Sequence, residues 1–80
     1  MITSKYLKNQ QDWDERIRVM ENNLRDGYLD FLYFNISINM IDAGDNADYD
    51  RELILKKMMM AFKKNDFRGI QNQIDRLKRK

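Results

Sequence analysis

Proline is absent from all 80 residues of this chain, and glycine occurs at only three positions. Proline interrupts helices because it lacks a backbone N–H group and its ring clashes with the preceding turn, and glycine weakens them through its backbone entropy. The sequence is instead rich in Leu, Met, Lys, Glu, Gln and Arg, which favour helices. It therefore predicts an all-α protein, and we expect a small bundle of three to four helices or helical hairpins.

Apolar side chains recur at steps of three or four residues along most of the chain, as they do on one face of an α-helix. The clearest stripe comprises Trp13, Ile17, Met20 and Leu24. The last one comprises Phe67, Ile70, Ile74 and Leu77. Oppositely charged Asp12 and Arg16, one turn apart, also favour a helix in the first segment. We expect a single domain over residues 1–80, with helices at about residues 10–26, 28–42, 49–64 and 66–79.

Short polar residues indicate where these helices begin and end. Asp and Asn cap helix N-termini because their side-chain oxygen accepts a hydrogen bond from an otherwise free backbone N–H. The candidate N-caps are Asn9, Asp48 and either Asn65 or Asp66. Residues 43–47 are the one clear loop, in which Gly44 suits the position after a helix end and residues 45–46 suit a turn.

Residues 28–42 fit two patterns. As a helix, they place on one face Leu29, Leu32, Tyr33, Ile36 and Met40. As a strand, they alternate apolar and polar side chains from Phe34 to Met40, and β-branched isoleucine favours a pleated sheet. A strand requires a partner, and the chain contains no second convincing strand. We therefore favour the helix, with a β-ribbon between two chains as the alternative.

A chain of this length has a small core, and small domains often gain stability from a disulfide, a metal or a second subunit. The chain has no cysteine and no histidine, which excludes a disulfide and a structural zinc site. We therefore expect a homo-oligomer that completes the core.

Catalytic groups are scarce. Without histidine or cysteine, the hydroxyl nucleophiles are Thr3, Ser4, Ser37 and the tyrosines, and no pattern resembles a nucleophile activated by a base. An acidic cluster comprises Asp42, Asp45, Asp48, Asp50 and Glu52. It does not match a calcium-binding loop, because Gly44 falls at the third position where that loop requires an acid or amide. We expect no enzyme activity, no catalytic residues, no metal site and no cofactor.

Charge is unevenly distributed along the chain. Residues 1–50 carry five basic and ten acidic side chains, a balance of −5, whereas residues 51–80 carry ten basic and three acidic ones, a balance of +7. A basic half can bind nucleic acid or another polyanion, or it can pair with the acidic half of its own chain. We favour pairing within the chain.

The predicted helix over residues 49–64 has a basic face with apolar residues in it. The candidate binding residues are Leu53, Lys56, Lys57, Met60, Lys63 and Lys64, together with Arg68. An apolar spot ringed by lysines can bind a protein partner, or can stack a base while ammonium groups contact phosphates. In the alternative that we favour, the fourth helix or another subunit covers Leu53 and Met60.

A second candidate patch comprises Tyr6, Lys8 and Arg16, where basic and aromatic residues alternate as in nucleotide-binding surfaces. Trp13 lies close to them in sequence, but its place on the apolar stripe predicts that it is buried in the core.

The sequence contains no candidate membrane segment. The first 15 residues lack the apolar region of a secretory signal, and the most apolar stretch, residues 28–41, is short and contains Asp30, Asn35 and Asn39. We expect no membrane association and a cytoplasmic location, which is the host cytoplasm if a phage encodes the chain.

Residues 51–57, with the sequence RELILKK, resemble a helical segment of small phage proteins that sequester cyclic oligonucleotide signals. The resemblance covers seven residues and implies nucleotide binding. The size, composition and compact helical pattern also look similar to accessory proteins of phages and other mobile elements. We expect a small regulatory or inhibitory protein that binds a protein partner, with binding of nucleic acid or cyclic nucleotides through the basic half as the alternative.

Overall fold

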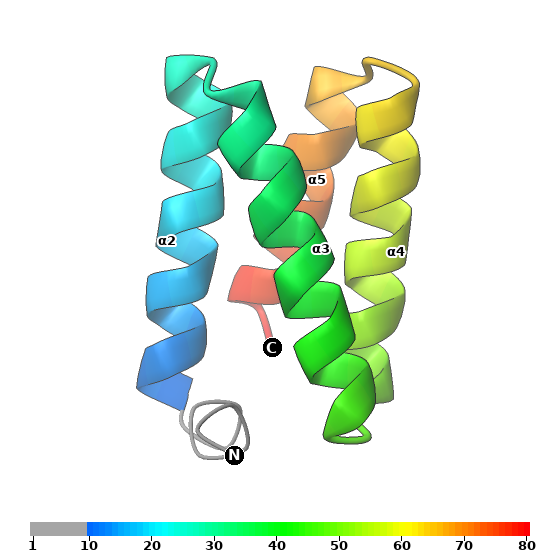
Figure 1. Cartoon of the computed structure of the whole chain (residues 1–80). Coiled ribbons are helices and arrows are strands. Elements are labelled where there is room, and N and C mark those ends of the chain that lie inside the picture. The colour runs from blue at the N-terminus through cyan, green and yellow to red at the C-terminus, as the bar shows by residue number, and fades with distance from the viewer. Residues whose placement is uncertain (1–9) are drawn as a thin grey trace.

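The computed structural model describes residues 10–80, which form four helices and no strand (Figure 1). The helices are α2 (Gln10–Asp26), α3 (Leu29–Asp45), α4 (Tyr49–Lys63) and α5 (Phe67–Lys78). The predicted all-α fold is confirmed. Residues 29–45 are helical, so the strand alternative for this segment is wrong.

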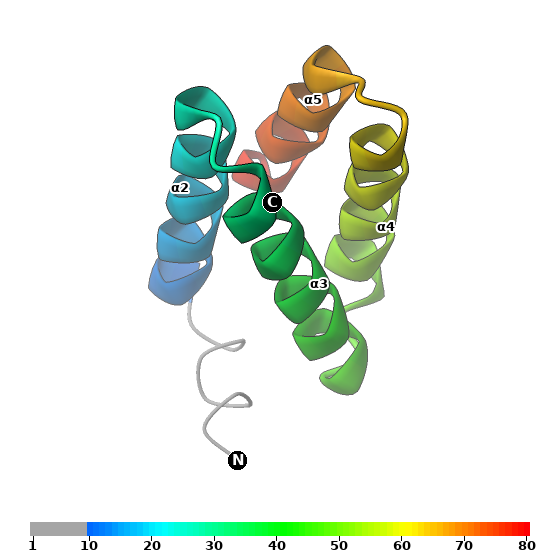
Figure 2. The same cartoon turned by 45° about the horizontal axis from the view of Figure 1, so that its top comes forward.

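Consecutive helices run in opposite directions and are joined by short turns (Figure 1). Each helix packs against two others, because α2 contacts α3, α3 contacts α4, α4 contacts α5, and α5 returns to α2. Figure 2 shows α3 crossing the front of the bundle between α2 and α4, with α5 behind. The four helices therefore form a ring around one core.

The core contains the apolar stripe of each helix. Its buried apolar members are Trp13, Ile17, Met20, Leu32, Ile36, Ala43, Leu55, Met58, Met59, Ile70, Ile74 and Leu77. The stripe predicted for the first helix is confirmed, with Leu24 partly buried at its end. Phe67, the first residue of α5, is 49% exposed, so it does not share the burial of the other three residues of its predicted stripe.

The buried face of α3 differs from the predicted one. Leu32 and Ile36 are buried as expected, but Asn39 and Ala43 complete the face, whereas Leu29 and Tyr33 are exposed. Apolar residues surround this helix on all sides, so apolar character alone does not identify the side that faces the core.

The turn between α3 and α4 begins later than predicted, because α3 continues through Gly44 to Asp45. Gly44 lies within α3, and a Cβ atom there would lie 2.7 Å from Oε2 of Glu52, at the movable end of that side chain. Ala47, with a φ of 58°, makes the turn instead. The prediction that residues 43–47 form a loop with Gly44 after the helix end is therefore wrong.

Two predicted N-caps are confirmed. The side chain of Asp48 accepts a hydrogen bond from the backbone N–H of Arg51, and that of Asp66 accepts one from Gly69. Of the two alternatives for the last helix, Asp66 is therefore the cap, and Asn65 precedes it with a φ of 56°. Asn9 lies outside the described residues.

A polar network joins α2 to α3 at the edge of the core. Nη1 of Arg16 donates to Oδ1 of Asn39 at 2.7 Å and to Oδ2 of Asp42 at 3.0 Å, while its Nε donates to Asp12. Asn39 is 4% exposed, so the guanidinium group provides the partner that its buried oxygen needs. The network also fixes how α2 and α3 are aligned along their axes.

Two leucines on α4 provide a matched test of this packing. We expect Leu55→Ala to lower the free energy of unfolding by about 2–5 kcal/mol, because it leaves a cavity in the core. Leu53→Ala, on the exposed side of the same helix, should change it by no more than about 0.5 kcal/mol. Urea unfolding followed by circular dichroism measures both values, and equal losses would contradict the orientation of α4.

Candidate partner-binding surface on α4

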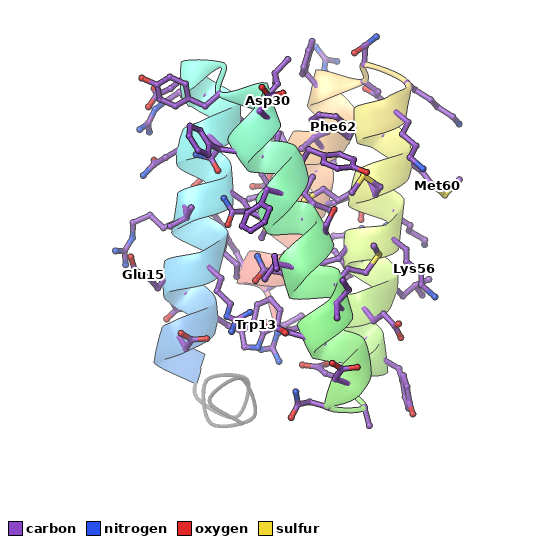
Figure 3. All side chains as sticks on the ribbon, viewed as in Figure 1. Trp13, Glu15, Asp30, Lys56, Met60 and Phe62 are labelled. Atoms are coloured by element: carbon purple, nitrogen blue, oxygen red, sulfur yellow. The ribbon has the colours of Figure 1, made fainter. Side chains whose placement is uncertain are left out.

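The outward side of α4 carries the main candidate residues. Because Leu55, Met58 and Met59 face the core, the side chains on the opposite side of the helix point to solvent. This α4 outer surface comprises Leu53, Lys56, Lys57, Met60, Lys63 and Lys64. Figure 3 shows Lys56 and Met60 pointing away from the other helices.

Leu53 and Met60 are 53% and 58% exposed, so α5 does not cover them. Of the two covers predicted for these residues, the fourth helix is therefore wrong, and another subunit stays a prediction. Tyr49, one turn before Leu53 and 67% exposed, extends the same row of side chains. Tyr49 is not among the binding residues predicted from the sequence, although its four-residue spacing from Leu53 indicates that both lie on the same side of the helix.

Most of the cations on this surface are not neutralised by residues 10–80. Nζ of Lys56 lies 3.9 Å from Oε2 of Glu52, at the limit of an ion pair. Lys57, Lys63 and Lys64 form no ion pair with any residue in the described range 10–80. The α4 outer surface therefore presents two apolar side chains within a positively charged surround.

A shallow depression of about 260 Å³ lies where this surface meets α5. It is lined by Lys57, Met60, Ala61, Lys64, Asp66, Gly69 and Gln73. The structure thus brings three of the predicted residues together with four that sequence analysis missed. Gly69 leaves space in the depression, because a Cβ atom there would lie 3.2 Å from the Cβ atom of Ala61. Arg68 is exposed on α5 but does not line the depression.

Residues of the second candidate patch are not brought together in the described part of the chain. Tyr6 and Lys8 lie outside the described residues. Arg16 belongs to the network with Asp12, Asn39 and Asp42, and its side chain is only 14% exposed. Trp13 is fully buried, which confirms its prediction as a core residue.

Most of the acidic cluster has structural roles. Asp42 binds Arg16, Asp48 caps α4 and binds Arg51, and Asp50 lies 2.9 Å from Nζ of Lys80. Within residues 10–80, no group of three or more acidic side chains is placed to hold a metal ion.

Part of the basic half pairs with the acidic half, as predicted. Nζ of Lys78 donates to Oε2 of Glu21 at 2.8 Å and joins α5 to α2. That hydrogen bond, together with one from Gln71, lowers the pKa of Glu21, and the bond to Glu21 raises the pKa of Lys78. Lys80 likewise lowers the pKa of Asp50. These contacts hold the end of α5, whereas the lysines on α4 are left for other interactions.

No helix in the described range is both long and apolar enough to cross a bilayer. Comparisons with protein-family models, with curated proteins and with solved structures found no match to this chain.

The Glu21–Lys78 pair predicts a pH dependence of stability. Because the pKa of Glu21 in the fold lies below its ordinary value of 4.5, its carboxylate stabilises the protein above pH 4.5. This contribution is lost as the pH falls through the lowered pKa. We therefore expect Glu21→Gln to destabilise the protein most near neutral pH, by an amount that shrinks in acid.

Urea unfolding of both proteins at a series of pH values from neutral to acidic measures this difference. Glu15→Gln is the matched control, because it removes the same charge from an exposed pair with Arg18 within α2. We expect the control to have a small effect, as exposed pairs contribute little. A difference between wild type and Glu21→Gln that does not change with pH would contradict the role of this pair.

Proposed function

We propose that this chain is a non-catalytic regulatory protein that binds a protein partner through its α4 outer surface. The observation that carries the proposal is the exposure of Leu53 and Met60 among lysines, of which Lys57, Lys63 and Lys64 have no ion-pair partner in residues 10–80. Exposed apolar side chains within a polar rim are typical of protein interaction sites. Binding would regulate the partner by covering part of its surface.

The chemistry of the surface indicates the kind of partner. Leu53 and Met60 lie two turns apart in one row, so they fit an apolar stripe on an amphipathic segment. Lysines on both sides of that row favour a segment whose apolar residues are flanked by Asp or Glu. Methionine is flexible and polarisable, which suits contact with an irregular apolar surface. We therefore propose an acidic amphipathic helix or loop as the element that binds.

A polyanion is the competing occupant, because lysines also bind phosphates. Two features favour protein. Leu53 and Met60, which lie among the lysines, offer no aromatic face for base stacking, and the one aromatic residue of the row, Tyr49, lies at its end. In addition, Lys78 and Lys80 at the basic end of the chain are already paired with Glu21 and Asp50. Capture of nucleic acid is therefore the alternative result of the affinity experiment.

The test is affinity capture from a lysate of the source cells, with and without nuclease. Three baits are compared: wild type, Met60→Glu, and the matched control Asn72→Glu, which adds the same charge at an exposed position on α5. We expect a protein that is captured by wild type and by the control in both conditions. Met60→Glu should reduce its recovery roughly tenfold or more, because it places a charge at the centre of the apolar row.

Circular dichroism establishes that both variants retain the helical fold. Recovery of nucleic acid, lost after nuclease treatment and falling steeply as salt rises, would replace the protein partner with a polyanion. Capture of the same proteins by Met60→Glu as by wild type would overturn the proposal for this surface.

A further inference from the structure

The outward face of α3 is apolar and uncovered within the described chain. Its side chains are Phe31, Phe34, Ile38 and Ile41, which are 63%, 60%, 41% and 57% exposed. We call these four residues the α3 stripe. The opposite side of the helix is buried in the core. Figures 1 and 2 show α3 at the front of the bundle with no described element over it. A helix that is apolar on all sides is normally buried on all sides.

The spacing of the α3 stripe fits a second helix. Its residues follow steps of three, four and three, which is the pattern of the a and d positions in helices that pair lengthwise. Such a pattern produces a straight row, against which another helix can pack along three turns.

We propose that the α3 stripe binds the same stripe of a second copy of this chain, with the two α3 helices antiparallel. The row is complementary to itself in this orientation. Rotation about a twofold axis at the level of Ile36 places Phe31 against the partner's Ile41, and Phe34 against the partner's Ile38. Each layer then pairs a large aromatic ring with a smaller branched side chain, which fills space better than two rings or two isoleucines.

Charge favours the antiparallel orientation over the parallel one. Asp45 lies one turn beyond Ile41 on the same side of α3, so parallel helices would place it beside its own copy. In the antiparallel pair it lies at the level of the partner's Gly27, so the two copies of Asp45 are kept far apart. Antiparallel packing also opposes the helix dipoles favourably.

The size of the apolar surface is appropriate for the centre of a dimer interface. The four side chains of the α3 stripe expose about 400 Å² per chain, given that a large apolar side chain has roughly 150–250 Å² of surface. A stable interface buries about 800 Å² per partner, much of it polar rim. Val19 adds to the apolar area, because it lies on α2 between Arg16 and Asn23, which both contact α3.

This dimer does not depend on the proposed function, because it uses a different helix face. The α4 outer surfaces of both copies would remain uncovered. The dimer would therefore present two copies of the surface that we propose for partner binding, which increases apparent affinity for a partner that is itself repeated.

Sedimentation over a range of protein concentrations tests the dimer. We expect wild type to sediment as a dimer, and Phe34→Glu to sediment as a monomer with unchanged helical content. Met60→Glu is the matched control, because it adds the same charge at a similarly exposed apolar residue, and it should remain dimeric. A monomeric wild type at the highest soluble concentration would overturn the proposal, as would a Phe34→Glu dimer as stable as that of wild type.

Crosslinking tests the orientation, and the absence of native cysteine makes single reporters practicable. Ser37→Cys lies next to the twofold axis, so a short bismaleimide should link two copies. Asp45→Cys should not link, because antiparallel packing separates the two copies of residue 45 by about 27 Å along the axis, at a rise of 1.5 Å per residue. Efficient linking of Asp45→Cys would overturn the antiparallel arrangement, and failure of Ser37→Cys to link would overturn the pairing of the α3 stripes.

Discussion

The indole of Trp13 lies between two guanidinium groups, and the arrangement of the bundle depends on this contact. The guanidinium carbons of Arg16 and Arg51 lie 5.3 and 4.9 Å from the ring centroid. The backbones of α2 and α4 do not contact each other across the ring of helices, so the pair of Trp13 and Arg51 joins them across the diagonal. Because burying a cation is unfavourable unless it is paired, each arginine needs a carboxylate nearby. Asp42 provides one for Arg16 and Asp48 provides one for Arg51.

This contact also determines which charges remain for binding. Arg16 and Arg51 are each 14% exposed in their side chains, so neither cation is presented to a partner. Their carboxylates, Asp42 and Asp48, come from the acidic cluster of residues 42–52, and each is paired with an arginine. Within residues 10–80, the cations that form no ion pair are Lys57, Lys63 and Lys64 at α4 and Arg68, Arg76 and Arg79 at α5. Local pairing within the fold thus leaves the uncommitted positive charge on α4 and α5.

The sequence predicts those features that depend on residues close in the chain. The stripe of α2, the cap at Asp48 and the pair of Asp12 with Arg16 follow from spacings of three or four residues, and all are present. The contact of Arg16 with Asp42 spans 26 residues, and no local pattern indicates it. The buried side of α3 could not be identified because both sides are apolar, and Gly44 resembles a helix end although α3 continues through it to Asp45. The exposure of Leu53 and Met60 likewise depends on where α5 packs, which the pattern of α4 does not contain.

The α4 outer surface and the α3 stripe are both left uncovered by residues 10–80, but their surroundings differ. This difference favours a different kind of partner for each. Leu53 and Met60 are bordered by lysines, so two copies of the α4 outer surface would bring like charges together, which disfavours self-association there. The α3 stripe contains no charged residue, and α3 has no basic residue; its carboxylates, Asp30, Asp42 and Asp45, border the row. A neutral row can pack against its own copy without bringing like charges together, whereas a positive surface favours an acidic partner. The same fold can therefore pair with itself through α3 and leave α4 for a different protein.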